Sequence, residues 1–317
     1  MSFVRLLPLI LVACTGATPS DDTAPVADTD VVTDTSPPEP EPVWSVFSVG
    51  TSSTLNGVYA SGEGVYVAGT GAGAFVGGAT GGWTALQTGL PDDDDFGDLW
   101  GQGAGATLEL LMGATSGNVI RYSGGAWSSE DLGTSNHEGV GGSGPGSLFA
   151  VSWGGAYHFD GVSWAFETLP DDARLNDIWA SGEDAFAVGE GGAIVRRTAG
   201  AWEAMDSGVD VDLNGISATA INDVWAVGAD GVALHFDGTT WTATETGVTE
   251  ALWAVFAPGT NAVYAVGNNG VALFYNGAEW ASLPTGVSNN LYAIHGASAV
   301  NVWAVGNRGT ALQYKAE

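Results

Sequence analysis

The stretch from Leu213 to Gly247 has the composition of a small four-stranded β-sheet. Four short apolar runs are separated by turn-forming residues, and the second run, DVWAVG, is rich in the β-branched and aromatic residues that strands prefer. The segments Ala229-Asp230-Gly231 and Asp237-Gly238 tolerate the positive φ that tight turns require. No run has the length or the period of an amphipathic helix. The stretch therefore predicts four consecutive antiparallel strands.

The same unit recurs along the chain, and an internal repeat constrains a fold more strongly than any single motif. The glycine that closes the second strand returns every 39 residues, at Gly189, Gly228, Gly267 and Gly306. A tryptophan opens six expected fourth strands, at Trp83, Trp127, Trp164, Trp202, Trp241 and Trp280. Seven first strands are expected to begin at Leu55, Phe96, His137, Leu175, Leu213, Leu252 and Leu291. One unit therefore lacks its fourth strand.

The missing strand lies before the first unit. The last unit stops after Gln313-Tyr314-Lys315, and the segment Val43-Trp44-Ser45-Val46-Phe47 belongs to no unit of its own. In a ring this segment completes the last blade and removes an open strand edge, whereas an open solenoid leaves the split unexplained. We predict an all-β fold over residues 43–317: a seven-bladed β-propeller of four-stranded blades, with the last blade closed by the N-terminal strand.

The charge balance limits the partners of such a domain. The chain has 36 acidic and 7 basic side chains, a net charge of −29. This excludes a nucleic-acid-binding surface, which needs clustered Lys and Arg, and argues against adsorption to anionic lipid. In a propeller the turns between strands two and three and the links between blades share one face. Most acidic residues fall in those segments, so we predict one acidic face that attracts cations or a basic partner.

The densest acidic run is a tentative cation site. It consists of Asp92, Asp93, Asp94 and Asp95, in the link that leads into the second unit. Carboxylate oxygens suit Ca²⁺, but the run lacks the spaced D-x-D-x-D-G pattern of a calcium loop. The alternative is a solvated loop that keeps the protein soluble. Apart from this Ca²⁺ hypothesis, no cofactor is expected.

The N-terminal segment resembles the leader of a bacterial lipoprotein. Arg5 precedes an apolar run that is too short to span a bilayer, so residues 1–13 are predicted to be a signal peptide. Leu11-Val12-Ala13-Cys14 resembles a lipobox, which implies that Cys14 is lipidated and becomes the mature N-terminus. The alternative is an ordinary signal peptide with an incidental cysteine. Cys14 is the only cysteine, so no disulfide within the chain is possible.

Residues 14–42 are predicted to be a lipidated cysteine followed by a disordered tether. From Thr15 to Pro42 the chain is rich in acidic residues and proline and has no basic or aromatic residue, so it cannot bury enough apolar surface to offset its ordering entropy. A recognition tail is the alternative to a passive spacer. The expected location is the bacterial cell envelope, at the outer membrane or cell surface. We expect a monomer whose only membrane contact is the lipid anchor.

The thirteen tryptophans allow two interpretations. Exposed rings stack on sugars, whereas periodic rings belong to a core, where each removes about 150–250 Å² from water. Most of these tryptophans occupy fixed positions of the repeat, which favours the core. Trp153 is out of register, next to Gly154 in a turn, and is the tentative exposed aromatic residue.

The repeat DVWAVG-x-x-G-x-x-L-x-F-D-G-x-x-W resembles that of secreted bacterial propellers of the WAVG type. It is also similar to the repeat of photosystem II assembly and stability factors, which share a V-G-x-x-G-x-I/L turn and a tryptophan after a D-G turn. A third resemblance is to the Asp-box (BNR) repeat of sialidase-type propellers, S-x-D-x-G-x-T-W. Here the segment from Phe236 to Trp241 lacks the serine and one residue between Asp and Gly, and Asn276 replaces the aspartate in the next unit.

No catalytic residue can be assigned. The arginines of the repeat region, which a sialidase-like site would have to bring together, are dispersed over several units. His158 and His235 share a strand-three position with Arg196, Phe274 and Gln313, which suggests that the position tolerates any residue, and no spacing fits a zinc site. Two function classes remain. The first is a non-enzymatic, envelope-anchored binding or scaffolding module for an envelope protein or glycan. The alternative is a degenerate carbohydrate-active hydrolase or glycan-binding propeller.

Overall fold

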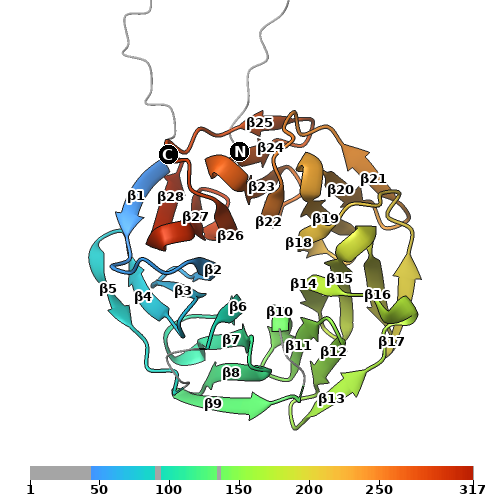
Figure 1. Cartoon of the computed structure of the whole chain (residues 1–317), viewed down its shortest axis with the longest axis horizontal. Helices are drawn as coiled ribbons and strands as arrows, with labels where there is room; N and C mark the ends of the chain where they lie inside the picture. Colours follow the sequence, from blue (N-terminus) through green and yellow to red (C-terminus); the bar gives the residue numbers. More distant parts are fainter. Residues whose placement is uncertain (1–43, 90–93, 134–136, 317) are drawn as a thin grey trace, which may run out of the picture. The chain divides into compact units, whose positions relative to one another are not determined.

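Seven four-stranded antiparallel sheets form a closed ring in the computed structural model, which describes residues 44–89, 94–133 and 137–316 (Figure 1). The predicted seven-bladed propeller is confirmed, and each inner strand begins at the residue that the repeat indicates. The inner strands, which surround the central channel, are β2 (Leu55–Ala60), β6 (Phe96–Gln102), β10 (His137–Gly144), β14 (Leu175–Ser181), β18 (Leu213–Ala220), β22 (Leu252–Gly259) and β26 (Leu291–Ser298).

The other strands follow outward in each blade. The second strands are β3 (Val65–Gly69), β7 (Glu109–Ala114), β11 (Ser147–Ser152), β15 (Asp184–Gly189), β19 (Asp223–Gly228), β23 (Ala262–Gly267) and β27 (Asn301–Gly306). The third strands are β4 (Ala74–Gly78), β8 (Asn118–Ser123), β12 (Gly155–Phe159), β16 (Ile194–Thr198), β20 (Ala233–Phe236), β24 (Ala272–Tyr275) and β28 (Thr310–Lys315). The outer strands are β5 (Gly81–Ala85), β9 (Ala126–Asp131), β13 (Trp164–Glu167), β17 (Ala201–Met205), β21 (Trp241–Thr244), β25 (Trp280–Ser282) and β1 (Trp44–Ser48).

Six short 3₁₀ turns complete the described elements: η1 (Gly105–Thr107), η2 (Pro170–Asp172), η3 (Glu190–Gly192), η4 (Ala229–Gly231), η5 (Asn268–Gly270) and η6 (Asn307–Gly309). Within the described ranges, we find no helix with the length and hydropathy needed to cross a membrane.

The ring closes through the N-terminal strand, as the split repeat predicts. Strand β1 pairs antiparallel with β28, with Trp44 opposite Tyr314 and Phe47 opposite Ala311. Trp44 is buried, and its ring lies 5.4 Å from that of Tyr314. Phe47 lies 5.1 Å from Trp303, centroid to centroid. The segment therefore contributes apolar contacts as well as hydrogen bonds to the last blade.

The core consists of apolar layers between neighbouring blades. Trp225 of β19 is almost fully buried and packs against Tyr275 and Trp280 of the next blade, at ring distances of 4.7 and 5.4 Å. Trp303 occupies the same position in the last blade and contacts Trp83 of the first at 6.0 Å. These periodic tryptophans thus lie where one sheet faces the next, and they are buried or half-buried. The repeat tryptophans of the inner strands, Trp100, Trp179 and Trp253, are half-buried and line the central cavity, so assigning the periodic rings to the core is wrong for them.

The turns between second and third strands pack against the links between blades. Gly231, in η4, has a φ of 71°, and a side chain there would overlap the carbonyl oxygen of Val248 in the following link. Gly192 in η3 has the same relation to Val209. Only glycine provides both the conformation and the space, which explains its recurrence. The contact also shows that turns and links lie at the same face of the ring.

Aspartate and asparagine are equivalent in the turn before the outer strand of the fifth and sixth blades. The Oδ1 of Asp237 accepts hydrogen bonds from the backbone N–H groups of Thr239 and Thr240, at 2.8 and 3.0 Å. In the next blade, Asn276 accepts the corresponding bonds from Ala278 and Glu279, at 2.9 and 3.1 Å. An amide oxygen serves this Asx turn as well as a carboxylate, so the change to asparagine leaves the blade intact.

The strand-three position of the two repeat histidines is more constrained than the sequence suggested. His235 Nε2 lies 2.7 Å from Asp223 Oδ1, at the start of the second strand of the same blade. The Nε2 of Gln313 donates to Asn301 Oδ1 at 2.8 Å, in the corresponding place. In the second blade the pair is Arg121 and Glu109. The interpretation that this position tolerates any residue is therefore wrong for these blades. Each side chain there pairs with the polar side chain at the start of the second strand of its own blade.

Candidate functional site

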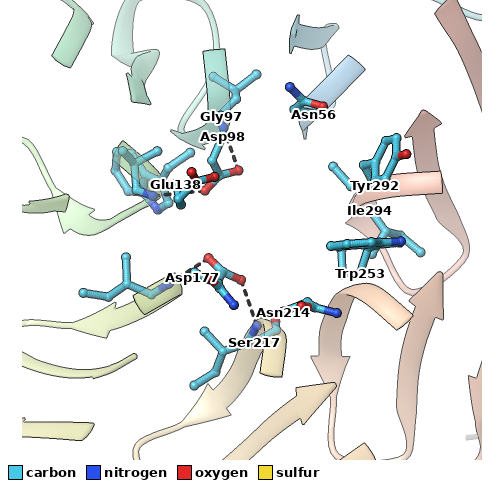
Figure 2. Close-up of a pocket in the computed structure, with 18 of the residues that line it drawn as sticks. Asn56, Gly97, Asp98, Glu138, Asp177, Asn214, Ser217, Trp253, Tyr292 and Ile294 are labelled. Atoms are coloured by element: carbon cyan, nitrogen blue, oxygen red, sulfur yellow. Dashed lines mark hydrogen bonds between the residues drawn. The ribbon is translucent and has the colours of Figure 1, made fainter. Parts of the chain in front are cut away.

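A cavity of about 750 Å³ occupies the mouth of the central channel. Its wall includes the second and fourth residues of all seven inner strands, and residues such as Asp95 and Glu190 from the links and turns. The cavity therefore opens at the face where turns and links emerge. Figure 2 shows its side chains projecting inward from different blades.

A β-bulge at the start of every inner strand supplies the lining. In the first blade Leu55 pairs with Gly69 and Gly57 with Ala68, so Asn56 between them has no partner on the neighbouring strand. A bulge turns its extra residue away from the sheet and re-aims its side chain. The same register shift occurs in all seven blades. The bulged residues are Asn56, Gly97, Glu138, Asn176, Asn214, Trp253 and Tyr292, and all of them line the cavity.

Three bulged asparagines join neighbouring blades. The Nδ2 groups of Asn56, Asn176 and Asn214 donate to the carbonyl oxygen of the first residue of the next inner strand, at 2.8, 2.9 and 2.8 Å. Glu138 makes no hydrogen bond or ion pair with any other described residue. The asparagines are thus engaged in holding the ring together, while the carboxyl group of Glu138 remains open to the channel.

Two aspartates occupy the third position of the inner strands, where the other five blades have glycine or alanine. Asp98 accepts hydrogen bonds from the N–H of Leu99 at 2.7 Å and from that of Val140, in the next blade, at 3.0 Å. Asp177 accepts from Ile178 at 2.7 Å and from Ile216, in the next blade, at 2.8 Å. Each carboxylate bridges two blades with its two oxygens.

Asp98, Glu138 and Asp177 come from three consecutive blades and project into one side of the cavity, which we call the carboxyl side (Figure 2). Burial raises the pKa of Asp98 to about 6. Burial, with the nearby charge of Asp98, raises the pKa of Asp177 well above its usual value. The pKa of Glu138 is also raised by burial. Loss of hydration and mutual repulsion disfavour the ionised forms, so a bound cation would stabilise them.

Trp253 and Tyr292 form the aromatic side of the cavity, across from the carboxyl side (Figure 2). Their rings meet edge to face at 5.5 Å. The Trp253 Nε1–H donates to Asn268 Oδ1 at 2.7 Å, and the Tyr292 hydroxyl accepts from Asn290 Nδ2 at 3.2 Å. Both rings are therefore held in place before any ligand arrives. Aromatic faces of this kind attract cations and pack against apolar groups.

His295 also lines the cavity and is neutral at physiological pH. Its Nδ1 accepts a hydrogen bond from the N–H of Ala60 at 3.2 Å, and burial lowers its pKa to about 4. It lies between Tyr59 and Phe256, at ring distances of 5.0 and 4.8 Å. His295 therefore adds no positive charge that would compete with a cationic ligand.

The tentative cation site is described only in part. Asp92 and Asp93 lie outside the described residues. Asp94 is buried, and its Oδ1 accepts hydrogen bonds from Thr115 Oγ1 and the Ser116 N–H at 3.2 and 3.1 Å. The Oδ1 of Asp95 accepts from the N–H of Gly71 at 2.7 Å. Both described carboxylates thus hold turns in place, and no group of three or more metal-ligating side chains comes together within the described part of the chain.

The other predicted site residues are Cys14 and Trp153. Cys14, the predicted signal peptide and the tether are outside the described residues. Trp153, in the turn between β11 and β12, is 49% exposed and borders the cavity. The guanidinium carbon of Arg174 lies 5.2 Å from its ring centroid.

Sequence reasoning missed the carboxyl side. Asp98, Glu138 and Asp177 belong to no recognised motif, and each lies inside an otherwise ordinary first strand. An alignment of the seven first strands by register reveals the two aspartates, because Asp98 and Asp177 replace the glycine or alanine of the other blades. The useful signal was the exception to the repeat rather than the repeat itself.

Comparisons with known proteins identify similar folds but do not identify the function. No protein-family model and no curated protein matches the chain. Among solved structures, it is similar to YCF48 bound to a D1 peptide, with 18% identity and a TM-score of 0.69, over 86% of this chain and 97% of the other. YCF48 from Cyanidioschyzon merolae matches with 16% identity and a TM-score of 0.68, over 86% and 99% of the two chains. The WD40 repeats of RRP9 match with 11% identity and a TM-score of 0.73, over 86% and 98%.

Proposed function

We propose that the protein is an envelope-anchored, non-enzymatic binding module whose channel mouth receives a positively charged, extended segment of a partner protein. The observation that carries this proposal is the cavity of about 750 Å³, with three carboxyl groups on one side and two fixed aromatic rings on the other. A Lys or Arg side chain matches both sides, through charge and through cation–π contact. The net charge of −29 would steer a basic partner towards the protein.

The structural comparisons support a protein ligand. One of the similar propellers, YCF48, is bound to a peptide of D1. The WD40 propellers of RRP9 and Doa1 are further matches of the same architecture. Both oxygens of Asp98 and of Asp177 accept hydrogen bonds from backbone N–H groups, which favours a binding role for this lining over hydrolysis.

The binding proposal can be tested by selecting random 12-residue peptides on the full chain. We expect enrichment of peptides that contain Lys or Arg, and weaker binding at higher salt. Glu138→Gln should lower the affinity of these peptides about tenfold, because it removes a charge from the cavity wall without removing a hydrogen bond. Glu203→Gln is the matched control, because Glu203 is exposed on the outer strand β17. Peptides insensitive to Glu138→Gln, or glycan turnover by the full chain, would contradict the proposal.

The anchor is a separate part of the proposal. It is supported by the lipobox-like Leu11-Val12-Ala13-Cys14 and by the acidic, proline-rich residues that follow it. Several acyl chains on one cysteine would give stable membrane attachment, at about 0.8 kcal/mol per buried CH₂. Cys14→Ser should move the protein from the detergent phase to the aqueous phase in a partitioning assay. Equal partitioning of both forms would remove the anchor from the proposal and leave the binding site unaffected.

A further inference from the structure

A small groove of about 260 Å³ lies beside the channel mouth on the third blade. Trp153 and Phe166 line it, and Leu169 is a buried part of its wall. Trp153 and Phe166 are 49% and 54% exposed, and they are the only aromatic side chains among the five exposed large hydrophobic residues of the described chain. Exposed rings that gather at one place mark an interaction site more strongly than scattered ones.

Both rings depart from the repeat. Phe166 lies opposite Tyr157 on the outer strand, two residues after the repeat tryptophan. The corresponding residues in the other blades are smaller: Ala85, Ser129, Ala204, Ala243, Ser282 and Val46. Trp153 belongs to a two-residue turn, whereas the last four blades have a three-residue 3₁₀ turn there. The structural needs of a blade therefore explain neither ring.

Neighbouring residues hold the groove in its observed form. The ring of Phe166 lies 5.3 Å from that of Tyr157 and covers Gly155, where a side chain would overlap it. The next residue, Glu167, accepts hydrogen bonds from Arg197 Nε and Nη2 at 2.8 and 2.7 Å, which fixes β13 against the fourth blade. A preformed groove loses little conformational entropy when a ligand binds.

The groove adjoins the channel mouth, because Trp153 lines both. We propose that it binds an aliphatic side chain of the same partner segment whose basic residue enters the channel mouth. This inference rests on the proposed function and adds a second specificity element to it. The two rings and Leu169 offer carbon surface to one small side chain. Asp172 at the groove's edge and the carboxyl side of the channel favour a segment with positive charge.

The test uses the peptides selected on the full chain. We expect them to share an aliphatic residue at a fixed spacing from Lys or Arg. Phe166→Ala introduces the residue that three other blades have at this position, and it should lower the affinity of these peptides about tenfold. A version of the same peptide with its aliphatic residue replaced by Gly should bind wild type and Phe166→Ala equally. This pair of peptides separates loss of the groove contact from any loss of folding.

The outcomes distinguish the two proposals. Peptides that depend on Glu138 but bind Phe166→Ala as tightly as wild type would overturn the groove and leave the channel site standing. Peptides that depend on Phe166 but not on Glu138 would overturn the joint site, since the groove would then act without the channel. Absence of any peptide that depends on Glu138 or Phe166 would overturn both.

Discussion

The carboxyl side and the aromatic side of the channel mouth use the same backbone device for different purposes. On both sides a bulge at the second residue of an inner strand turns a side chain into the cavity. Glu138 occupies this position on the carboxyl side, and Trp253 and Tyr292 occupy it on the aromatic side. The scaffold therefore fixes where a side chain points, while the individual blade sets its chemistry.

The two sides also differ in how their groups are stabilised. The aromatic rings are satisfied without a ligand, because Trp253 and Tyr292 each have a hydrogen-bond partner and contact one another. On the carboxyl side, ionisation of Asp98 and Asp177 costs free energy, because burial, and for Asp177 the nearby charge of Asp98, raise the pKa of these groups. Although each of these carboxylates also bridges two blades, carboxyl groups with strongly raised pKa values that line a cavity are typical of a binding site. The comparison predicts that the two sides respond differently to pH, salt and truncation.

The largest effect is expected from opening the ring near the aromatic side. Deletion of residues 43–49 removes β1 from the blade that carries Tyr292, with the buried contacts of Trp44 and Phe47. We expect a loss of about 5 kcal/mol or more in the free energy of unfolding, and an exposed edge on β28. Thermal denaturation followed by circular dichroism measures this. An unchanged, cooperative transition would show that β1 does not close the ring.

The next effect is a pH dependence of stability that arises from the carboxyl side. Because burial raises the folded-state pKa of Asp98 to about 6, its contribution to stability is fully present below about pH 4 and is lost as pH rises through about 6. The raised pKa of Asp177 acts in the same direction. Between about pH 4.5 and 7.5, a window around the pKa of Asp98, the wild type should lose about 1–3 kcal/mol of stability relative to an Asp98→Ala/Asp177→Ala variant.

Alanine is a suitable replacement at these positions, because Ala254 and Ala293 occupy them in two other blades. The double variant also loses the hydrogen bonds from the N–H groups of Val140 and Ile216. This loss lowers stability at both pH values, so it cancels when the change in stability with pH is compared. Tyr292→Phe on the aromatic side should keep the wild-type pH profile. Parallel profiles for the wild type and the double variant would refute the raised pKa values.

A smaller effect is expected from truncation on the aromatic side. Trp253→Ala should weaken the selected peptides by about 1–2 kcal/mol, through loss of cation–π and apolar contact. Unlike Glu138→Gln, it should leave the dependence of affinity on salt unchanged, because no formal charge is removed. Fluorescence anisotropy at two ionic strengths measures both quantities. An altered salt dependence in Trp253→Ala would mean that the two sides are not separable.

The smallest effect concerns Ca²⁺ at the tentative cation site. The proposal is weak binding by the run from Asp92 to Asp95, of which Asp95 also borders the cavity. Asp92→Asn/Asp93→Asn spares Asp94 and Asp95, whose carboxylates hold turns. Calorimetry with CaCl₂ should give a smaller heat for this variant than for the wild type. Equal and negligible heats would leave solubility as the role of these residues.

The repeat predicted the architecture because each of its parts has a local physical cause. Glycines such as Gly231 are required by positive φ and close packing, and tryptophans such as Trp225 fill the space between sheets. These causes recur in successive blades, so single-sequence periodicity reveals them. The closing role of β1 followed from the same reasoning, since an edge strand without a partner is unfavourable.

The candidate site could not be predicted in the same way. The bulge that turns Glu138 into the channel depends on the register between β10 and β11, which the sequence does not specify. Asp98 and Asp177 come close only when the ring forms, and their raised pKa values depend on that proximity and burial. The acidic composition of the sequence points to the dense run from Asp92 to Asp95, of which Asp94 is engaged in a turn.

Proton release on peptide binding tests the central claim most directly. Near pH 6 the carboxyl group of Asp98 is partly protonated, and the pKa of Asp177 is raised in the same direction. A basic residue in the channel would stabilise the ionised forms of both groups and lower their pKa. Calorimetry of a selected peptide in buffers of different ionisation enthalpy should therefore show net proton release by the wild type, and a smaller release by Asp98→Ala/Asp177→Ala. The same binding enthalpy in every buffer for the wild type would contradict the placement of a cationic residue beside these carboxyl groups.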